Sequence, residues 1–154
     1  MTSDASTWDA KAWEEQLIAD LRANGGRPSQ GPLAGNPLMV LYTTGAKSGE
    51  QRRSIVTYSN DGTGAYYIVG SYGGNPTRHP SWYHNIVANP NVTIEIGPDT
   101  FSAVATDLRG AERDQAWDRH VEQLPNFGEY PAKVTGRTIP VIRVTPSAKL
   151  AAAR

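Results

Sequence analysis

The fold is decided by residues 37–58, which read PLMVLYTTGAKSGEQRRSIVTY. Two apolar stretches, residues 37–44 and 52–59, flank a short run of glycine, serine and basic residues. Apolar runs of this length around a glycine-containing turn are typical of a β-hairpin. A P-loop is excluded, because that motif needs glycine directly before the lysine and again five residues earlier, where Ala46 and Leu41 stand.

The turn of this hairpin is a candidate anion site. Lys47, Arg52 and Arg53 fall within seven residues, beside two glycines that expose backbone N–H groups. Such a loop suits a phosphate or a polyanionic tail, so a phosphorylated cofactor is the first hypothesis. A basic turn is also an ordinary solvated hairpin, and the loop alone leaves both interpretations open.

Composition limits the possible functions. The chain has 154 residues with 15 basic and 15 acidic side chains, so no overall positive charge draws it to nucleic acid. It has no cysteine, which removes disulfides and thiolate chemistry. No apolar run is long enough to span a membrane and no signal-peptide pattern is present, so we expect a cytoplasmic protein. We expect one domain, with a helix and linker in residues 1–36 and a core in residues 37–146.

Hydrophobic periodicity and turn signals predict the remaining elements. Expected helices are residues 7–24, 80–88 and 110–124, and further strands are residues 65–71, 92–96, 100–108 and 138–144, the last interrupted by Pro140. Short turns between the first three strands favour an antiparallel meander. The pattern as a whole predicts a mainly β, α+β fold, a small antiparallel barrel with peripheral helices.

A second candidate site follows the third predicted strand, in residues 71–85. Two glycines, Gly73 and Gly74, would let backbone approach a flat ligand, with Trp82 as a wall and Asn85 as a polar contact. Trp82 would equally pack its helix on the barrel, and a turn role is the default for the glycines. The three histidines lack the spacing of a metal site. In the absence of nucleophile motifs, an enzyme of this sequence would rely on a bound cofactor.

Four blocks in this order resemble the deazaflavin-dependent nitroreductase family, within the split β-barrel flavin-binding group. They are TTGAKSG at residues 43–49 with Arg52-Arg53, Gly70-Ser71, HPSWYHNIVANP at residues 79–90, and RTIPV at residues 137–141. The resemblance implies a split barrel of six or seven strands that binds coenzyme F420, an 8-hydroxy-5-deazaflavin.

The resemblance also implies the site residues. Those for the cofactor phosphate and tail are Lys47, Ser48, Gly49, Arg52 and Arg53; those beside the ring are Gly70, Ser71, Tyr72, Gly73 and Gly74; and those of the pocket wall are Pro80, Trp82 and Asn85. Phe127 and Tyr130 match the substrate-binding stretch. Tyr72 replaces a lysine that is common in the family, and Phe127 replaces a tyrosine.

The implied reaction is hydride transfer from the reduced deazaflavin to a quinone, an activated enone or a nitroaromatic. Ser71 and Tyr130 are the candidate catalytic residues, which would steady negative charge on the acceptor oxygen. Two alternatives are a flavin mononucleotide (FMN)-binding oxidase or reductase of the same barrel group and a non-catalytic deazaflavin carrier. The expected partner is a small-molecule acceptor, in a monomer or homodimer. Weak contact between the N-terminal helix and the inner face of the plasma membrane is a further hypothesis.

Overall fold

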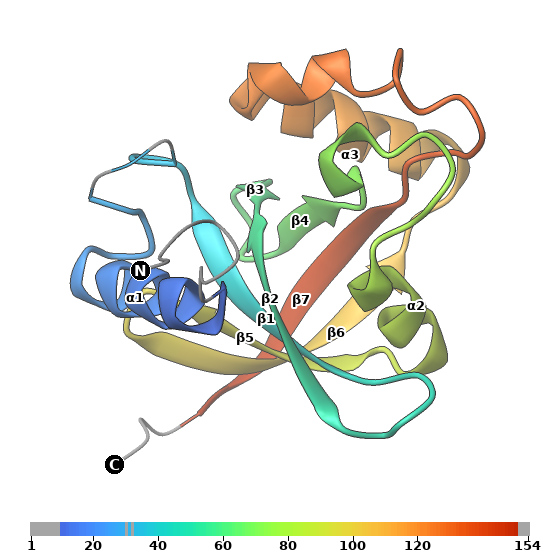
Figure 1. Ribbon diagram of the computed structural model, residues 1–154. Coiled ribbons are helices and arrows are strands. Elements are labelled where there is room, and N and C mark those ends of the chain that lie inside the picture. Colours follow the sequence, from blue (N-terminus) through green and yellow to red (C-terminus); the bar gives the residue numbers. More distant parts are fainter. Residues whose placement is uncertain (1–9, 30, 32, 151–154) are drawn as a thin grey trace, which may run out of the picture.

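The computed structural model describes residues 10–29, 31 and 33–150 as one strongly curled antiparallel sheet with three α-helices (Figure 1). The helices are α1 (Ala10–Ala23), α2 (Ser81–Ala88) and α3 (Gly110–Gln123), and two 3-10 turns are η2 (Tyr72–Gly74) and η3 (Pro125–Glu129). The strands are β1 (Leu38–Thr44), β2 (Gln51–Thr57), β3 (Ser59–Asn60), β4 (Tyr66–Val69), β5 (Asn91–Ile96), β6 (Asp99–Asp107) and β7 (Val141–Leu150). The predicted α+β, mainly β class is confirmed. Residues 7–9 of the predicted first helix lie outside the described residues.

The predicted hairpin around the basic loop is confirmed. Strands β1 and β2 pair antiparallel from Leu38↔Thr57 to Thr44↔Gln51. On the other side of β1 follow β5 and β6, themselves a hairpin from Asn91↔Val104 to Ile96↔Asp99. These pairs join segments that carry alternating apolar residues and short turns, which is why the sequence predicts them.

The predicted meander of the first three strands is wrong. The sheet order is β2-β1-β5-β6-β7-β4-β3, so β4 pairs with β7 and β3 and not with β2. Strands β2 and β3 are the two edges of the sheet, yet only Tyr58 separates them in the chain. The sheet therefore curls until its edges approach each other. Pairing through β7 joins segments far apart in sequence, which local turn signals do not reveal.

The last strand also differs from the prediction of residues 138–144. Strand β7 begins after Pro140, and it runs through Pro146 to Leu150. Opposite Ser102 and Ala103 the register shifts, so that Ser147 is the extra residue of a bulge next to Pro146. A bulge tolerates proline inside a strand because no ladder hydrogen bond is required there.

The inside of the curl holds the main apolar core. Strand residues such as Met39, Leu41 and Ile94 are fully buried there, and Trp82 and Ile86 of α2 close one end. On the outer face, α3 covers β4 and β7, while α1 covers β1 and β2 through Ile18 and Leu21 (Figure 1). No helix among the described residues is long and apolar enough to cross a bilayer.

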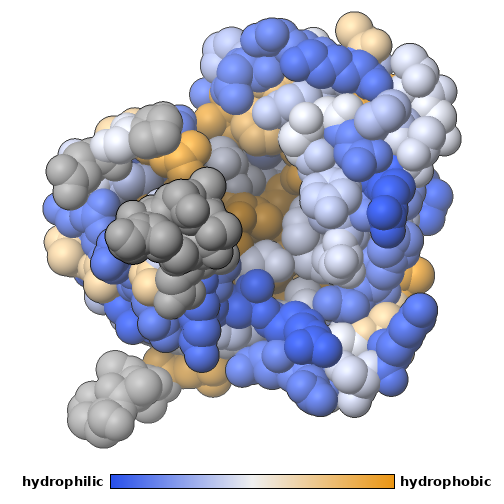
Figure 2. All heavy atoms as spheres, viewed as in Figure 1, coloured by the Kyte–Doolittle hydropathy of each residue, from blue (hydrophilic) through white to orange (hydrophobic). Residues whose placement is uncertain are grey.

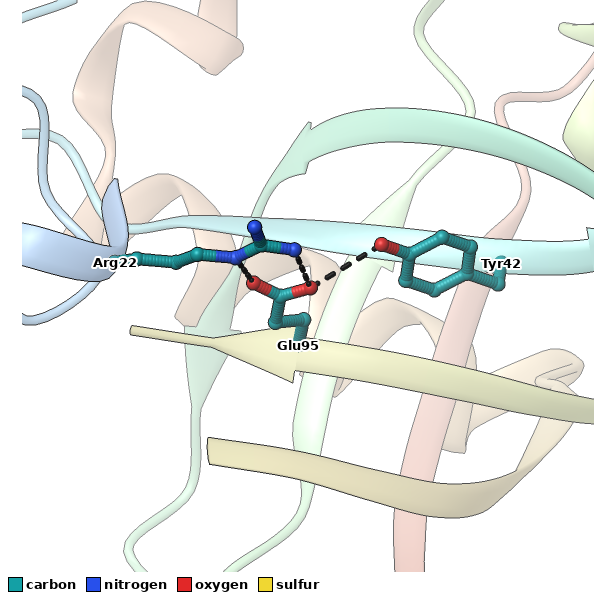
Figure 3. A network of polar contacts seen from close by, with 3 residues as sticks. All are labelled: Arg22, Tyr42 and Glu95. Atoms are coloured by element: carbon teal, nitrogen blue, oxygen red, sulfur yellow. Dashed lines mark hydrogen bonds and ion pairs between the residues drawn. The ribbon is translucent and has the colours of Figure 1, made fainter. Parts of the chain in front are cut away.

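A buried carboxylate fixes the end of α1 on the sheet. Figure 3 shows Arg22 of α1 and Tyr42 of β1 converging on Glu95 of β5. Arg22 binds both carboxylate oxygens, with 3.0 Å between Nη2 and Oε1, and the Tyr42 hydroxyl donates to Oε1 at 3.2 Å. Burial, and then the charge of Glu95, raise the pKa of Tyr42, which keeps it a donor. Along α1, Leu17 and Leu21 pack toward the sheet, whereas Trp13 is 47% exposed.

Candidate active site

A groove in two parts runs between β2 and α2. We call them the basic end, about 560 Å³, and the apolar end, about 420 Å³. The basic end is lined by Gly45, Ala46, Lys47, Ser48, Arg52, Arg53, Ser54, Ser81, Trp82, His84 and Asn85. The apolar end is lined by Ser54, Ile55, Val56, Thr57, Val69, Ser71, Tyr72, Pro80, Ser81, Trp82 and Phe127. Because Ser54, Ser81 and Trp82 belong to both, the two parts are continuous.

The molecule is visibly hollowed on the face shown in Figure 2, over the region where Figure 1 shows β2, β3 and β4. Apolar residues form the floor of this hollow, and neutral to hydrophilic residues lie along much of its rim. An apolar floor with a few polar groups at the rim is the usual make-up of a small-molecule site.

The β1–β2 turn builds the basic end. Its backbone closes through hydrogen bonds from Gly45 N to Glu50 O, 2.7 Å, and from Gly49 N to Gly45 O, 2.9 Å. The Ser48 hydroxyl accepts from Glu50 N at 3.1 Å and from Arg52 Nη2 at 3.3 Å. The exposed Lys47 and Arg52 thus lie at the mouth of a well-defined turn, on a chain that is neutral overall. A local cationic site of this kind attracts phosphate or carboxylate groups.

Arg53 is shared between the groove and α1. Its Nε lies 2.7 Å from Oε1 of Glu14, and both side chains are 30% exposed. The N-terminal helix therefore places a carboxylate beside the basic end, which the sequence does not indicate.

Asn85 ties α2 to the turn. Its Nδ2 donates to Thr43 Oγ1 at 3.0 Å, and its Oδ1 accepts from Ala46 N at 2.9 Å, with Asn85 itself only 8% exposed. The amide predicted to contact the cofactor directly is thus engaged with the protein. In this arrangement it holds the basic turn in place over the groove.

The free edge of β2 forms one wall of the apolar end. Residues 54–57 all line it. Successive side chains of a strand point to opposite faces of the sheet, so four successive residues can line one groove only where the edge of the strand, with its backbone, faces that groove. Just beyond the ends of the two strands, Tyr58 N donates to Pro37 O at 3.2 Å, which sets the phase of the ladder. The peptide groups of Ile55 and Thr57 on β2 therefore face away from β1. A flat heterocycle with amide donors and acceptors can pair with such an edge.

The opposite wall is the loop of residues 70–75, which follows β4. Gly70 has no room for a side chain, since a Cβ there would lie 2.7 Å from Pro140 Cγ. Ser71 is 8% exposed and lines the groove, and Tyr72 is the only non-glycine residue with positive φ, 49°, in the described part of the chain. Backbone strain of this kind is retained where the surrounding structure holds it, often at functional sites.

The two predicted catalytic residues separate in the structure. Ser71 lines the apolar end, whereas Tyr130 packs behind the lining, with its ring 5.4 Å from that of Phe127 and its Cδ1 3.2 Å from the position of a Cβ on Gly74. Phe127, predicted to contact substrate, does line the groove.

A buried histidine supports Phe127 from behind. The rings of His120 and Phe127 meet edge to face at 4.6 Å, and His120 Nδ1 lies 2.7 Å from Ser59 Oγ. Burial lowers the pKa of His120 to about 4, so it is neutral near pH 7.

Most of the residues predicted from the sequence therefore meet in one groove. Those that line it are Lys47, Ser48, Arg52, Arg53, Ser71, Tyr72, Pro80, Trp82, Asn85 and Phe127. Those that lie outside its lining are Gly49, Gly70, Gly73, Gly74 and Tyr130. Sequence reasoning missed the β2 wall, residues 54–57, together with Ser81, His84, and Glu14. Residues 54–57 directly follow the basic loop, and this position could have indicated them. Ser81, His84 and Glu14 carry no such signal.

Comparison with known proteins points to one family. The model of the F420H(2)-dependent quinone reductase family matches residues 14–146. A protein of Mycobacterium tuberculosis named F420H(2)-dependent quinone reductase is 38% identical over 149 residues, which cover 92% of this chain and 98% of that protein.

Solved structures agree with this match. One described as an F420-H2 dependent reductase has a TM-score of 0.63 and 41% identity, and covers 70% of this chain and 93% of its own. Another, described as a domain-swapped dimer, has a TM-score of 0.65 and 36% identity, and covers 88% of this chain and 99% of its own. The predicted F420-dependent family and its cofactor are confirmed: the chain belongs to the F420H(2)-dependent quinone reductase family, whose cofactor is coenzyme F420.

Proposed function

We propose that this protein is an F420H2-dependent reductase that transfers a hydride from reduced coenzyme F420 to a quinone or a similar electrophile such as an activated enone or a nitroaromatic. The observation that carries the proposal is the continuous groove, cationic at one end and aromatic and apolar at the other, with Trp82 at the junction.

The residues of the groove fit the cofactor. Lys47, Arg52 and Arg53 would hold its phosphate and the start of its glutamate tail, and the apolar end would take the flat ring. The exposed peptide edge of β2 at Ile55 and Thr57 offers donors and acceptors to the amide groups of that ring. When bound, the reduced deazaflavin supplies a hydride.

The protein contributes position and environment to the reaction. With the cofactor bound, Pro80, Trp82 and Phe127 would help to exclude water from the apolar end, which strengthens electrostatic interactions made there. Ser71, whose hydroxyl makes no hydrogen bond within the described part of the chain, would donate to the oxygen on which negative charge develops. Holding donor and acceptor in register is the rest of the protein's task.

Binding titrations followed by tryptophan fluorescence test the cofactor. We expect tight binding of F420 and weak binding of FMN. A Lys47→Ala, Arg52→Ala double variant should raise the Kd for F420 about tenfold or more, with a weaker dependence on salt. Lys149→Ala is the matched control, because its ion pair with Asp99, 3.0 Å, does not involve the groove lining.

Adding a quinone to the loaded protein tests the reaction. We expect oxidation of the bound reduced cofactor at a rate that depends on quinone concentration. Tight binding without oxidation by any quinone, enone or nitroaromatic would instead make the protein a cofactor carrier. Preferential binding of FMN would move it to the flavin branch of the fold.

We also propose that one chain is sufficient for activity in the cytoplasm. The proposal is supported by the groove lining, which supplies both a cationic end and an apolar end without a second copy of the chain. Specific activity should therefore not change on dilution, whether or not the protein also forms a dimer such as the one reported for its relative. Retention of the protein on anionic vesicles would add the membrane contact considered above.

A further inference from the structure

Arg137 directs its whole guanidinium group at residues 70–79. Nη1 donates to Gly70 O at 2.8 Å, Nη2 to Ser71 O at 2.9 Å, and Nη2 and Nε to Asn75 O at 3.0 and 3.3 Å. Nη1 also lies 3.1 Å from His79 Nδ1. These five contacts match the five N–H groups of arginine, so none is left for a ligand.

The contact with Arg137 determines which ring nitrogen of His79 carries the proton. Arginine stays protonated in proteins and can only donate, so Nδ1 of His79 accepts and its proton resides on Nε2. Next to His79 lie Arg137, Tyr83, with ring centroids 4.7 Å apart, His84, at 5.8 Å, and Asp107. The charged side chains of Arg109, Arg113 and Asp114 line the same cavity. Burial, then the charges of Arg137 and His84, lower the pKa of His79, against the opposing charge of Asp107.

We propose that Arg137, with His79 as its neutral acceptor, is a positioning residue for hydride transfer that fixes the wall of the apolar end. By holding the carbonyls of Gly70, Ser71 and Asn75, it sets where Ser71 and Tyr72 face the groove. The role in catalysis rests on the proposed function, whereas the role in ordering the loop does not.

The chemistry of the contacts explains why an arginine is needed. Arg137 makes no ion pair with a carboxylate of the described residues, so its role here is geometric and not charge neutralisation. A planar fork can bind several carbonyls in fixed directions, whereas the single ammonium of lysine cannot. The loop also carries the strained backbone of Tyr72, which requires such support.

Hydrogen exchange of the cofactor-free protein tests the ordering of the loop. In Arg137→Lys and Arg137→Ala we expect amides of residues 70–75 to exchange about tenfold faster or more, with the global unfolding midpoint nearly unchanged. Arg78→Ala is the matched control, an exposed arginine of the same segment. Unchanged exchange in both Arg137 variants would overturn the proposal, even if the protein proved not to bind F420.

Kinetics test the catalytic consequence. Arg137 contacts none of the cations that would hold the cofactor phosphate and tail, so the Kd for F420 should stay within about threefold in Arg137→Lys. The kcat should fall about tenfold or more, since a 1 Å misplacement can cost about a hundredfold. Methylguanidine should partly restore kcat in Arg137→Ala. An equal loss of kcat and of cofactor affinity, without rescue, would contradict the positioning role.

A pH profile tests the part played by His79. Protonated His79 would face the cation of Arg137 and lose its acceptor, so wild-type kcat should fall as pH drops below the ordinary histidine range near 6.5. His79→Asn retains an acceptor that cannot be protonated, and its profile should lack this acid limb. The same limb in the variant would exclude His79 from the mechanism.

Discussion

Glu14 and Arg53 form an ion pair, 2.7 Å between Oε1 and Nε, that joins the N-terminal helix to the cationic end of the groove. The carboxylate competes with any anion that approaches Arg53. The first helix therefore bears on the basic end of the groove without lining it.

Removing this competition should tighten cofactor binding. Partly exposed ion pairs contribute about 0.2–1 kcal/mol, so Glu14→Gln should lower the Kd for F420 by up to about fivefold. Glu15→Gln, an exposed neighbour on the same helix, is the control. Weaker binding in Glu14→Gln would show instead that the pair is needed to hold Arg53 toward the groove.

Removing the Ser71 hydroxyl should affect turnover more than binding. Loss of one donor to a developing oxyanion costs about 100- to 1000-fold in favourable cases, and we expect Ser71→Ala to lower kcat at least about tenfold. Ser81→Ala, at an exposed serine that also lines the groove, is the control in the same steady-state assay. Equal kinetics of the two variants would remove Ser71 from the reaction.

Tyr130 presents the opposite case. Because its ring packs against Gly74 and Phe127 behind the groove, Tyr130→Phe should keep kcat within about twofold, whereas Tyr130→Ala should lower it through lost packing. Steady-state kinetics of both variants distinguish the contribution of the Tyr130 ring to kcat from that of its hydroxyl. A large fall in kcat at unchanged F420 affinity in Tyr130→Phe would return the hydroxyl to the mechanism predicted from the sequence.

His120 should make the protein less stable in mild acid. Its pKa of about 4 in the folded state lies below the ordinary value near 6.5, so only the unfolded chain binds the proton between these values. The free energy of unfolding should fall as pH drops through this window, by on the order of 3 kcal/mol in full.

Urea denaturation at pH 7 and pH 5 measures this effect. His120→Asn keeps an acceptor for Ser59 without titrating, and although less stable at pH 7 it should lose less on acidification. Hydrogen bonds from Thr63 are the main reason that the pKa of Asp61 is lowered to about 2. Asp61 therefore changes the free energy of unfolding only at a pH below this window. The same pH dependence in wild type and variant would exclude His120 as its source.

Local elements of this fold were predictable, and its closure was not. The β1–β2 hairpin and α2 carry their own signals, an alternating strand pattern around a glycine turn and Pro80 at a helix start. The insertion of β7 between β6 and β4 depends on pairs such as Val69↔Val141, which join segments far apart in the sequence. No residue near Val69 encodes that choice.

The candidate site also has residues that local sequence predicts and residues that depend on the tertiary fold. Cations in a glycine-rich turn indicate an anion site through residue type alone, so Lys47 and Arg52 could be predicted as candidates from the sequence. The wall at residues 54–57 depends on which edge of β2 is free, which follows from the sheet order. Arg137 acts on backbone carbonyls, which every residue has, so residue types did not reveal its partners.

The place of β7 in the sheet has a consequence for biosynthesis. Every residue that lines the groove has been translated by residue 127, yet β4, which leads into Ser71, has only the two residues of β3 as a partner until β7 emerges from the ribosome. A nascent or truncated chain that ends at residue 140 would carry the whole site in its sequence and still lack the wall that presents it. Formation of this wall of the groove therefore depends on a strand that is synthesised after every residue of the groove lining.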